Sequence, residues 1–178
     1  MAGTIALIGA PSDVGAGARG ASMGPEALRV AQLQPMLEAQ GLEAVDRGNL
    51  AGPPNPWQPP VNGYRHLPEV IEWNRLVHEA VLEELAAGRL PMLLGGDHSL
   101  AIGSISAAAR HCRDTGRKLR VLWFDAHADF NTHVLTPSGN VHGMPAACLC
   151  GHGPSDLVSI GGQVPAINPA QLRQIGIR

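Results

Sequence analysis

LRVLWFDAHADFNTHVLTPSGNVHG, residues 119–143, places a hydrophobic run directly before a cluster of polar side chains. Leucine, valine and aromatic residues dominate its first six positions, which predicts a buried strand. Asp125, His127 and Asp129 follow at two-residue spacing. If the chain stays extended beyond the strand, these three side chains point to one side. Burying unpaired carboxylates costs several kcal/mol, so the pattern indicates a bound divalent cation.

A second polar cluster follows another predicted strand. LPMLL (90–94) runs into GGDHS (95–99), which contains His98. Ligands bind beyond the carboxyl ends of strands in open parallel sheets, so His98 could complete the cluster. Oxygen and imidazole donors without a thiolate disfavour a structural zinc site and suit Mn²⁺, Mg²⁺ or Fe²⁺. The competing interpretation is a capped loop with surface acids, and the joint occurrence of several such clusters after strands disfavours it.

Strand and helix patterns alternate along the whole chain. We expect strands at residues 4–9, 42–48, 90–94, 119–125 and 174–178. Helices are expected at residues 23–41, 68–88, 99–116 and 143–151, with Ser99 as the cap of the third. The proline-rich residues 49–68 predict an irregular excursion. The alternation predicts an α/β fold with an open, mostly parallel sheet covered on both faces.

The composition narrows the class of protein. A length of 178 residues with 44% hydrophobic residues and a net charge of -2 fits one ordered domain. This charge gives no electrostatic case for nucleic acid or an anionic membrane as a partner. The apolar runs are far shorter than the roughly 20 residues of a membrane span, and the N-terminus lacks the basic region of a signal peptide. We therefore expect a cytoplasmic protein with Cys112, Cys148 and Cys150 as free thiols.

A glycine-rich loop follows the first strand. Gly15, Gly17 and Gly20 match the pattern GxGxxG, which is typical of dinucleotide-binding sites. That motif needs its first glycine at the strand end, whereas APSDV separates Gly9 from Gly15. We therefore favour tight turns in an active-site loop as the use of these glycines.

Together, these motifs resemble a known enzyme family. GGDHSLAIGS (95–104), WFDAHADFNT (123–132) and SGNVHGMPAA (138–147) resemble the ureohydrolases, and specifically the arginases. GAPSDVGAGARGASMGPEALR (9–29) is similar to the opening of the same family. The resemblance implies a single ureohydrolase domain over residues 1–178 with a three-layer αβα, arginase/deacetylase-like fold. It also implies two Mn²⁺ ions per complete site, L-arginine as the small-molecule substrate, and a homotrimer or homohexamer.

By motif position, the resemblance implies a role for individual residues. The metal ligands would be His98, Asp125, His127 and Asp129, with Asp125 bridging the two ions. The α-carboxylate and α-amino end of the substrate would be held by Asn131, Ser138 and Asn140. His142 resembles a proton-shuttle histidine, and Asp97 resembles a residue that orients the ligands. The implied reaction is hydrolysis of L-arginine to L-ornithine and urea by a hydroxide held between the metal ions.

The sequence departs from the arginase pattern in one respect. Arginases carry a further motif, Asp-x-Asp-x-x-Asp-Pro, and a later glutamate, and neither occurs in this sequence. We therefore expect a chain that is truncated on its C-terminal side and inactive alone. An agmatinase, a guanidino-acid hydrolase, a formimidoylglutamase and a non-catalytic remnant of the fold remain alternatives. The segment SGNVHG favours arginase over agmatinase, because its Ser138 and Asn140 would bind a carboxylate and agmatine has none.

Overall fold

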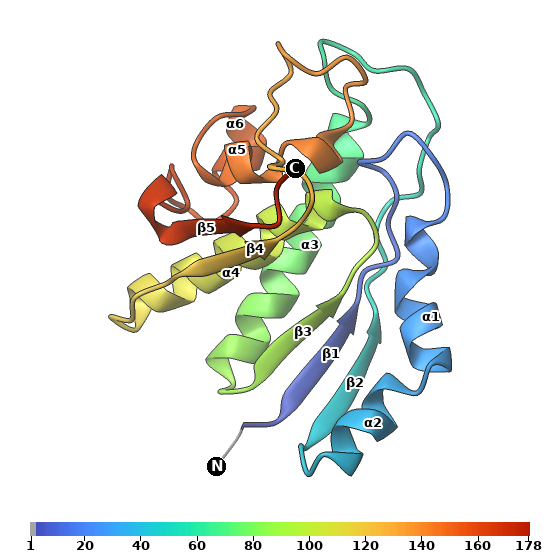
Figure 1. The fold of residues 1–178 in the computed structure, drawn as a ribbon, viewed down its shortest axis with the longest axis vertical. Coiled ribbons are helices and arrows are strands. Elements are labelled where there is room, and N and C mark those ends of the chain that lie inside the picture. The colour runs from blue at the N-terminus through green and yellow to red at the C-terminus, as the bar shows by residue number, and fades with distance from the viewer. Residues whose placement is uncertain (1–2) are drawn as a thin grey trace.

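Two parallel β-sheets form the centre of the molecule (Figure 1). A computed structural model describes residues 3–178. Met1 and Ala2, where the expected domain begins, lie outside the described residues. The first sheet has the strand order β2 (Ala44–Asn49), β1 (Ile5–Gly9), β3 (Leu90–Leu94). The second sheet pairs β4 (Val121–Phe124) with β5 (Leu172–Ile175). These five strands pair only in parallel, which agrees with the predicted mostly parallel arrangement. The expected single sheet is divided, because no ladder joins β3 to β4 within residues 3–178.

Helices cover both faces of the three-stranded sheet (Figure 1). The alternating side chains of β1 show this arrangement. Ile5 and Leu7 pack in a cluster with leucines of α2 (Leu33–Ala39), whereas Ile8 packs in the larger core with α3 (Leu67–Ala86). The three-layer αβα arrangement is therefore confirmed.

The helix α4 (Ala101–Asp114) packs beside α3 and covers one face of β4. Val121 and Trp123 are buried on that face. Leu122 and Phe124 point to the opposite face and are 57% and 72% exposed. Among the described residues, that second face of β4 therefore lacks a covering layer.

The helix expected over residues 23–41 is divided into α1 (Gly24–Val30) and α2. Gln32 separates them with a left-handed φ of 62°. Pro35 explains the break, because its ring would clash with a helical carbonyl four residues earlier and it has no N–H to donate. Restarting the helix at Leu33 places Pro35 in a first turn, where proline is tolerated.

The remaining elements are short. They comprise α5 (Pro145–Leu149), α6 (Ser155–Val158) and the 3₁₀ helices η1 (Ala21–Met23), η2 (His98–Leu100), η3 (Val141–Gly143) and η4 (Pro169–Gln171). Residues 50–66 form the expected irregular segment, which Trp73 anchors by donating from Nε1 to the Pro53 carbonyl. Cys148 and Cys150 are buried free thiols, and Cys112 is half-buried. No helix in residues 3–178 has both the length and the apolar character that a membrane crossing requires.

Candidate metal centre

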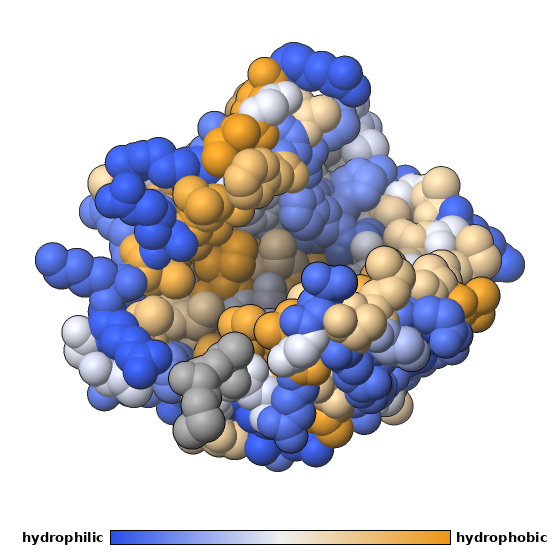
Figure 2. All heavy atoms as spheres, turned by 60° about the horizontal axis from the view of Figure 1, so that its bottom comes forward, coloured by the Kyte–Doolittle hydropathy of each residue, from blue (hydrophilic) through white to orange (hydrophobic). Residues whose placement is uncertain are grey.

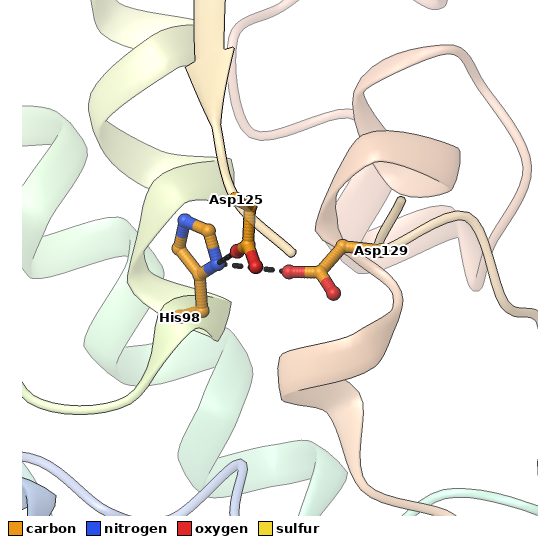
Figure 3. Close-up of side chains that lie close together, drawn as sticks. All are labelled: His98, Asp125 and Asp129. Atoms are coloured by element: carbon orange, nitrogen blue, oxygen red, sulfur yellow. Dashed lines mark ion pairs between the residues drawn. The ribbon is translucent and has the colours of Figure 1, made fainter. Parts of the chain in front are cut away.

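His98, Asp125 and Asp129 converge at the carboxyl ends of β3 and β4 (Figure 3). Nδ1 of His98 lies 2.8 Å from a carboxylate oxygen of Asp129 and 3.0 Å from one of Asp125. One potential ligand atom from each residue lies within 4.8 Å of the other two. Two carboxylates at this separation repel each other unless a cation lies between them. An imidazole with two carboxylates is a donor set that fits a divalent ion such as Mn²⁺.

The turn after β3 fixes the position of His98. Asp97 caps η2, with one carboxylate oxygen accepting the Ser99 N–H at 2.9 Å and the other accepting the Gly15 N–H at 3.0 Å. The prediction of Ser99 as the cap is wrong, because a 3₁₀ turn begins at His98 and places Ser99 inside it. The His98 ring also lies against Trp123, with 4.6 Å between the ring centroids. The cap and this contact together orient the imidazole.

The segment after β4 bends instead of remaining extended, so the predicted conformation is wrong. A carboxylate oxygen of Asp125 accepts the His127 N–H at 2.9 Å, which closes an Asx turn. Asp129 then adopts a left-handed φ of 47°, and its carbonyl accepts the Ala146 N–H at the start of α5. The bend brings Asp129 toward His98. The His127 side chain is 81% exposed, and its Nδ1 lies 3.4 Å from Asp125, beside the group of three.

Electrostatic interactions within the cluster shift two pKa values. The hydrogen bond to Asp129 raises the pKa of His98 and outweighs the opposing effect of burial. The backbone hydrogen bond from His127 lowers the pKa of Asp125 against a smaller effect of burial. The Asp125 carboxylate is therefore ionised at neutral pH, and a metal ion binding at His98 competes with a proton for the imidazole.

A cavity of about 700 Å³ opens over the cluster. Its lining includes all four predicted metal ligands together with Asn131 and His142. The Asn131 N–H donates to the Gly143 carbonyl at 3.1 Å, which holds Asn131 close to His142.

Ser138 and Asn140 do not line this cavity. A side-chain contact with Arg65 holds Asn140, whose Oδ1 accepts from Arg65 Nε at 2.9 Å. Sequence reasoning missed Arg65, because it is 75 residues away from Asn140 along the chain and belongs to no motif. Of the three predicted substrate-binding residues, Asn131 therefore lines the cavity, whereas Ser138 and Asn140 lie outside its lining.

The glycine-rich loop packs against the same region. A Cβ atom on Gly15 would lie 2.5 Å from Asp97, and one on Gly17 would lie 3.1 Å from Asn140. The His142 N–H donates to the Gly15 carbonyl at 3.1 Å. Close approach therefore requires glycine at Gly15, whereas a side chain at Gly17 would make a tight contact with Asn140. The loop's contacts agree with its interpretation as part of the site.

Comparison with known proteins gives one consistent family. The family model described as Arginase family matches residues 3–178. An arginase from Brevibacillus brevis is 38% identical over 174 residues, which cover 98% of this chain and 57% of the relative. An arginase from Bacillus caldovelox is 39% identical over 176 residues, or 98% of this chain and 58% of the relative. Its native crystal structure matches with a TM-score of 0.90 and 38% identity, covering 99% of this chain and 58% of that one. The chain thus spans less than two thirds of these relatives and corresponds to their N-terminal portion.

Proposed function

Because the chain belongs to the arginase family, we propose that it forms the N-terminal part of a manganese-dependent hydrolase that converts L-arginine to L-ornithine and urea. The convergence of His98, Asp125 and Asp129 is the observation that carries this proposal. His127 is the proposed fourth ligand, since it lies beside Asp125 on the same cavity. The proposal includes two Mn²⁺ ions per complete site and a cytoplasmic homotrimer or homohexamer.

The chemistry of the reaction explains the need for these groups. A guanidinium carbon is resonance-stabilised and is a poor electrophile for neutral water. Bound divalent ions would lower the pKa of water toward about 7 and so supply a nucleophile. Asp125 and Asp129 would hold the ions together with His98 and His127. His142, in the cavity lining, would donate a proton to the departing amine of ornithine.

The two ends of the substrate need separate contacts. Asn131, which lines the cavity, and Ser138 and Asn140, which lie outside its lining, would together hold the α-carboxylate and α-amino end. This end of the substrate is remote from the guanidinium group. Ser138 and Asn140 are coupled, because the Asn140 N–H donates to Ser138 Oγ at 3.2 Å. Agmatine lacks the carboxylate, so this pair favours arginine as the substrate.

Manganese binding tests the proposed ligands. Titration of the chain with Mn²⁺, followed by electron paramagnetic resonance, is expected to show binding that Asp125→Asn and Asp129→Asn each weaken strongly. His142→Ala should leave binding unchanged, and Asp114→Asn, at an exposed position on α4, provides the matched control. Equal binding by the chain and both ligand variants would exclude the proposed metal centre. Loss of manganese in His142→Ala would identify that histidine as a ligand.

Urea release tests the reaction. The isolated chain is expected to release little or no urea from arginine. A protein that also contains the rest of the arginase fold should release urea from arginine faster than from agmatine. The opposite preference would identify an agmatinase, and bound manganese without urea release from either compound would identify a non-catalytic member of the family.

A further inference from the structure

A second cavity, of about 710 Å³, lies at the amino ends of β4 and β5. Its wall comes from the last turns of α4, the loop 115–120 that leads into β4, and residues 163–171 before β5. Because β4 and β5 pair in parallel, their amino ends lie together, on the side of the molecule where α4 ends (Figure 1). The candidate metal centre lies beyond the other end of β4, a strand about 13 Å long. The two cavities share no lining residue.

The lining of this second cavity is strongly basic. It contains four basic side chains and, among the described residues, no acidic one. They are Arg113, Arg117, Lys118 and Arg120. None of the four forms an ion pair within residues 3–178, since the neighbouring Asp114 pairs with Arg110 at 3.7 Å. Hydrophilic side chains gather on this side of the molecule in the view from the end at which β1 and β3 begin (Figure 2). Because the net charge of the whole chain is -2, this positive charge is a local concentration.

Hydrogen bonds join the three segments of the wall and occupy several of its acceptor groups. Arg113 donates from its two terminal nitrogens to the carbonyls of Ala166 at 3.2 Å and Gly161 at 2.9 Å. Gln171 donates from Nε2 to the Leu119 carbonyl at 3.2 Å. The wall is therefore held in place before any ligand binds, and three of its carbonyl groups are already satisfied.

The four cations are placed differently with respect to α4. Arg113 lies in the last turn of the helix, where its charge offsets the partial negative charge of the helix end. Arg117, Lys118 and Arg120 follow the helix, in the loop that leads into β4. Their three positive charges therefore remain for a ligand. Guanidinium groups bind phosphate oxygens through paired N–H groups, and an ammonium group adds a compact charge.

The rest of the wall narrows the class of ligand. A cavity of this volume is typical of small-molecule sites, which range over roughly 300–1,000 Å³. Leu119, Pro165 and Ala166 give the wall an apolar part. A single carboxylate would pair with one guanidinium group and leave the other cations without a counter-charge. Two linked phosphoryl groups carry more negative charges and more acceptor oxygens, and can contact several of the cations together.

We propose that this cavity binds a diphosphate group through Arg117, Lys118 and Arg120. The group could be supplied by inorganic pyrophosphate, or by a nucleoside diphosphate whose base contacts the apolar part of the wall. Either source presents the same charge to the loop 115–120. The proposal is independent of the proposed hydrolysis, because the site shares no residue with the metal-centre cavity.

Isothermal titration calorimetry of the chain tests the ligand class, in low salt and without manganese or arginine. The probes are inorganic pyrophosphate, ADP and adenosine. Pyrophosphate and ADP should each bind at one site per chain, and adenosine at least about tenfold more weakly than ADP, because the phosphates carry the charge. Equal affinities for pyrophosphate and ADP would assign the site to the diphosphate group alone. Tighter binding of ADP would assign it to a nucleoside diphosphate.

Three variants at exposed positions test the basic wall. Arg117→Gln and Arg120→Gln are each expected to weaken pyrophosphate binding about tenfold, which corresponds to about 1.4 kcal/mol. Arg75→Gln is the matched control, because it removes the same charge from α3, outside the lining of this cavity. Its effect should be less than about twofold. Circular dichroism of all three variants checks that each is folded.

Amide chemical shifts locate the bound anion on the unmodified chain. On addition of pyrophosphate, nuclear magnetic resonance spectra should show shifts of the Leu119, Arg120 and Ala170 amides. The His127 and Gly143 amides, at the metal-centre cavity, should not move. Three outcomes would overturn the proposal: no binding of pyrophosphate or ADP, equal weakening by Arg120→Gln and Arg75→Gln, and shifts confined to the metal-centre cavity. A failed manganese titration would contradict the metal centre alone, because none of these measurements contains manganese.

Discussion

Asp97→Ala is expected to destabilise the fold and to weaken the metal centre, although Asp97 lies outside the ligand cluster. The Asp97 side chain is buried, and its two oxygens accept the N–H groups of Ser99 and Gly15. Removing a helix cap costs about 1 kcal/mol. The buried N–H of Gly15 would also lose its partner, at a cost of about 1–3 kcal/mol. The free energy of unfolding should therefore fall by about 2–4 kcal/mol.

Two measurements check this expectation. Guanidinium denaturation followed by tryptophan fluorescence gives the free energy of unfolding, and Mn²⁺ titration gives the affinity. The affinity should fall about 10- to 100-fold, because Asp97 fixes the turn that carries His98. Asp97→Asn keeps one acceptor oxygen and should have an intermediate effect, whereas Asp114→Ala, at an exposed position, should be near neutral. A folded Asp97→Ala variant that matches Asp114→Ala in both measurements would refute this role.

Three further predictions concern the rest of the chain. At pH 8, a thiol reagent should modify Cys112 and spare Cys148, because burial raises the pKa of Cys148 to about 12. Equal reaction rates of these two thiols would contradict this expectation. As a control, guanidinium should make all three thiols reactive. Gly103→Ala should lower the free energy of unfolding by about 1–3 kcal/mol, since the new Cβ would lie 2.3 Å from the Asn74 carbonyl oxygen. An unchanged melting temperature would show that α3 and α4 separate easily. Burial raises the pKa of Glu84, but hydrogen bonds from two arginines outweigh burial and lower the pKa below 4.5. The stability that Glu84 adds over Glu84→Gln should therefore be present above pH 4.5 and decline as the pH falls below 4.5. A pH-independent difference in the free energy of unfolding would argue against this ion pair.

The sequence was informative where local pattern and topology act together. The run of leucine, valine and aromatic residues before Asp125 predicted β4, and a similar run before His98 predicted β3. Parallel strands bring their carboxyl ends to one edge of a sheet. The approach of His98 to Asp125 therefore followed from the alternation of strands and helices, without knowledge of any side-chain contact.

Features that depend on non-local contacts or on single backbone torsions were not predictable in this way. Two-residue spacing suggested that Asp125 and Asp129 share the face of an extended chain, yet an Asx turn and a left-handed torsion at Asp129 bring them together. Ser99 and Asp97 are both good capping residues, and only the start of the 3₁₀ turn distinguishes them. The contact of Arg65 with Asn140 joins segments with no common sequence pattern.

The hydrogen bonds that position the cluster lie within this chain. Asp97 orients His98, the turn at Asp125 sets the path to Asp129, and α5 holds the Asp129 carbonyl. The geometry of the three proposed ligands is therefore set by local turns and caps within the described residues.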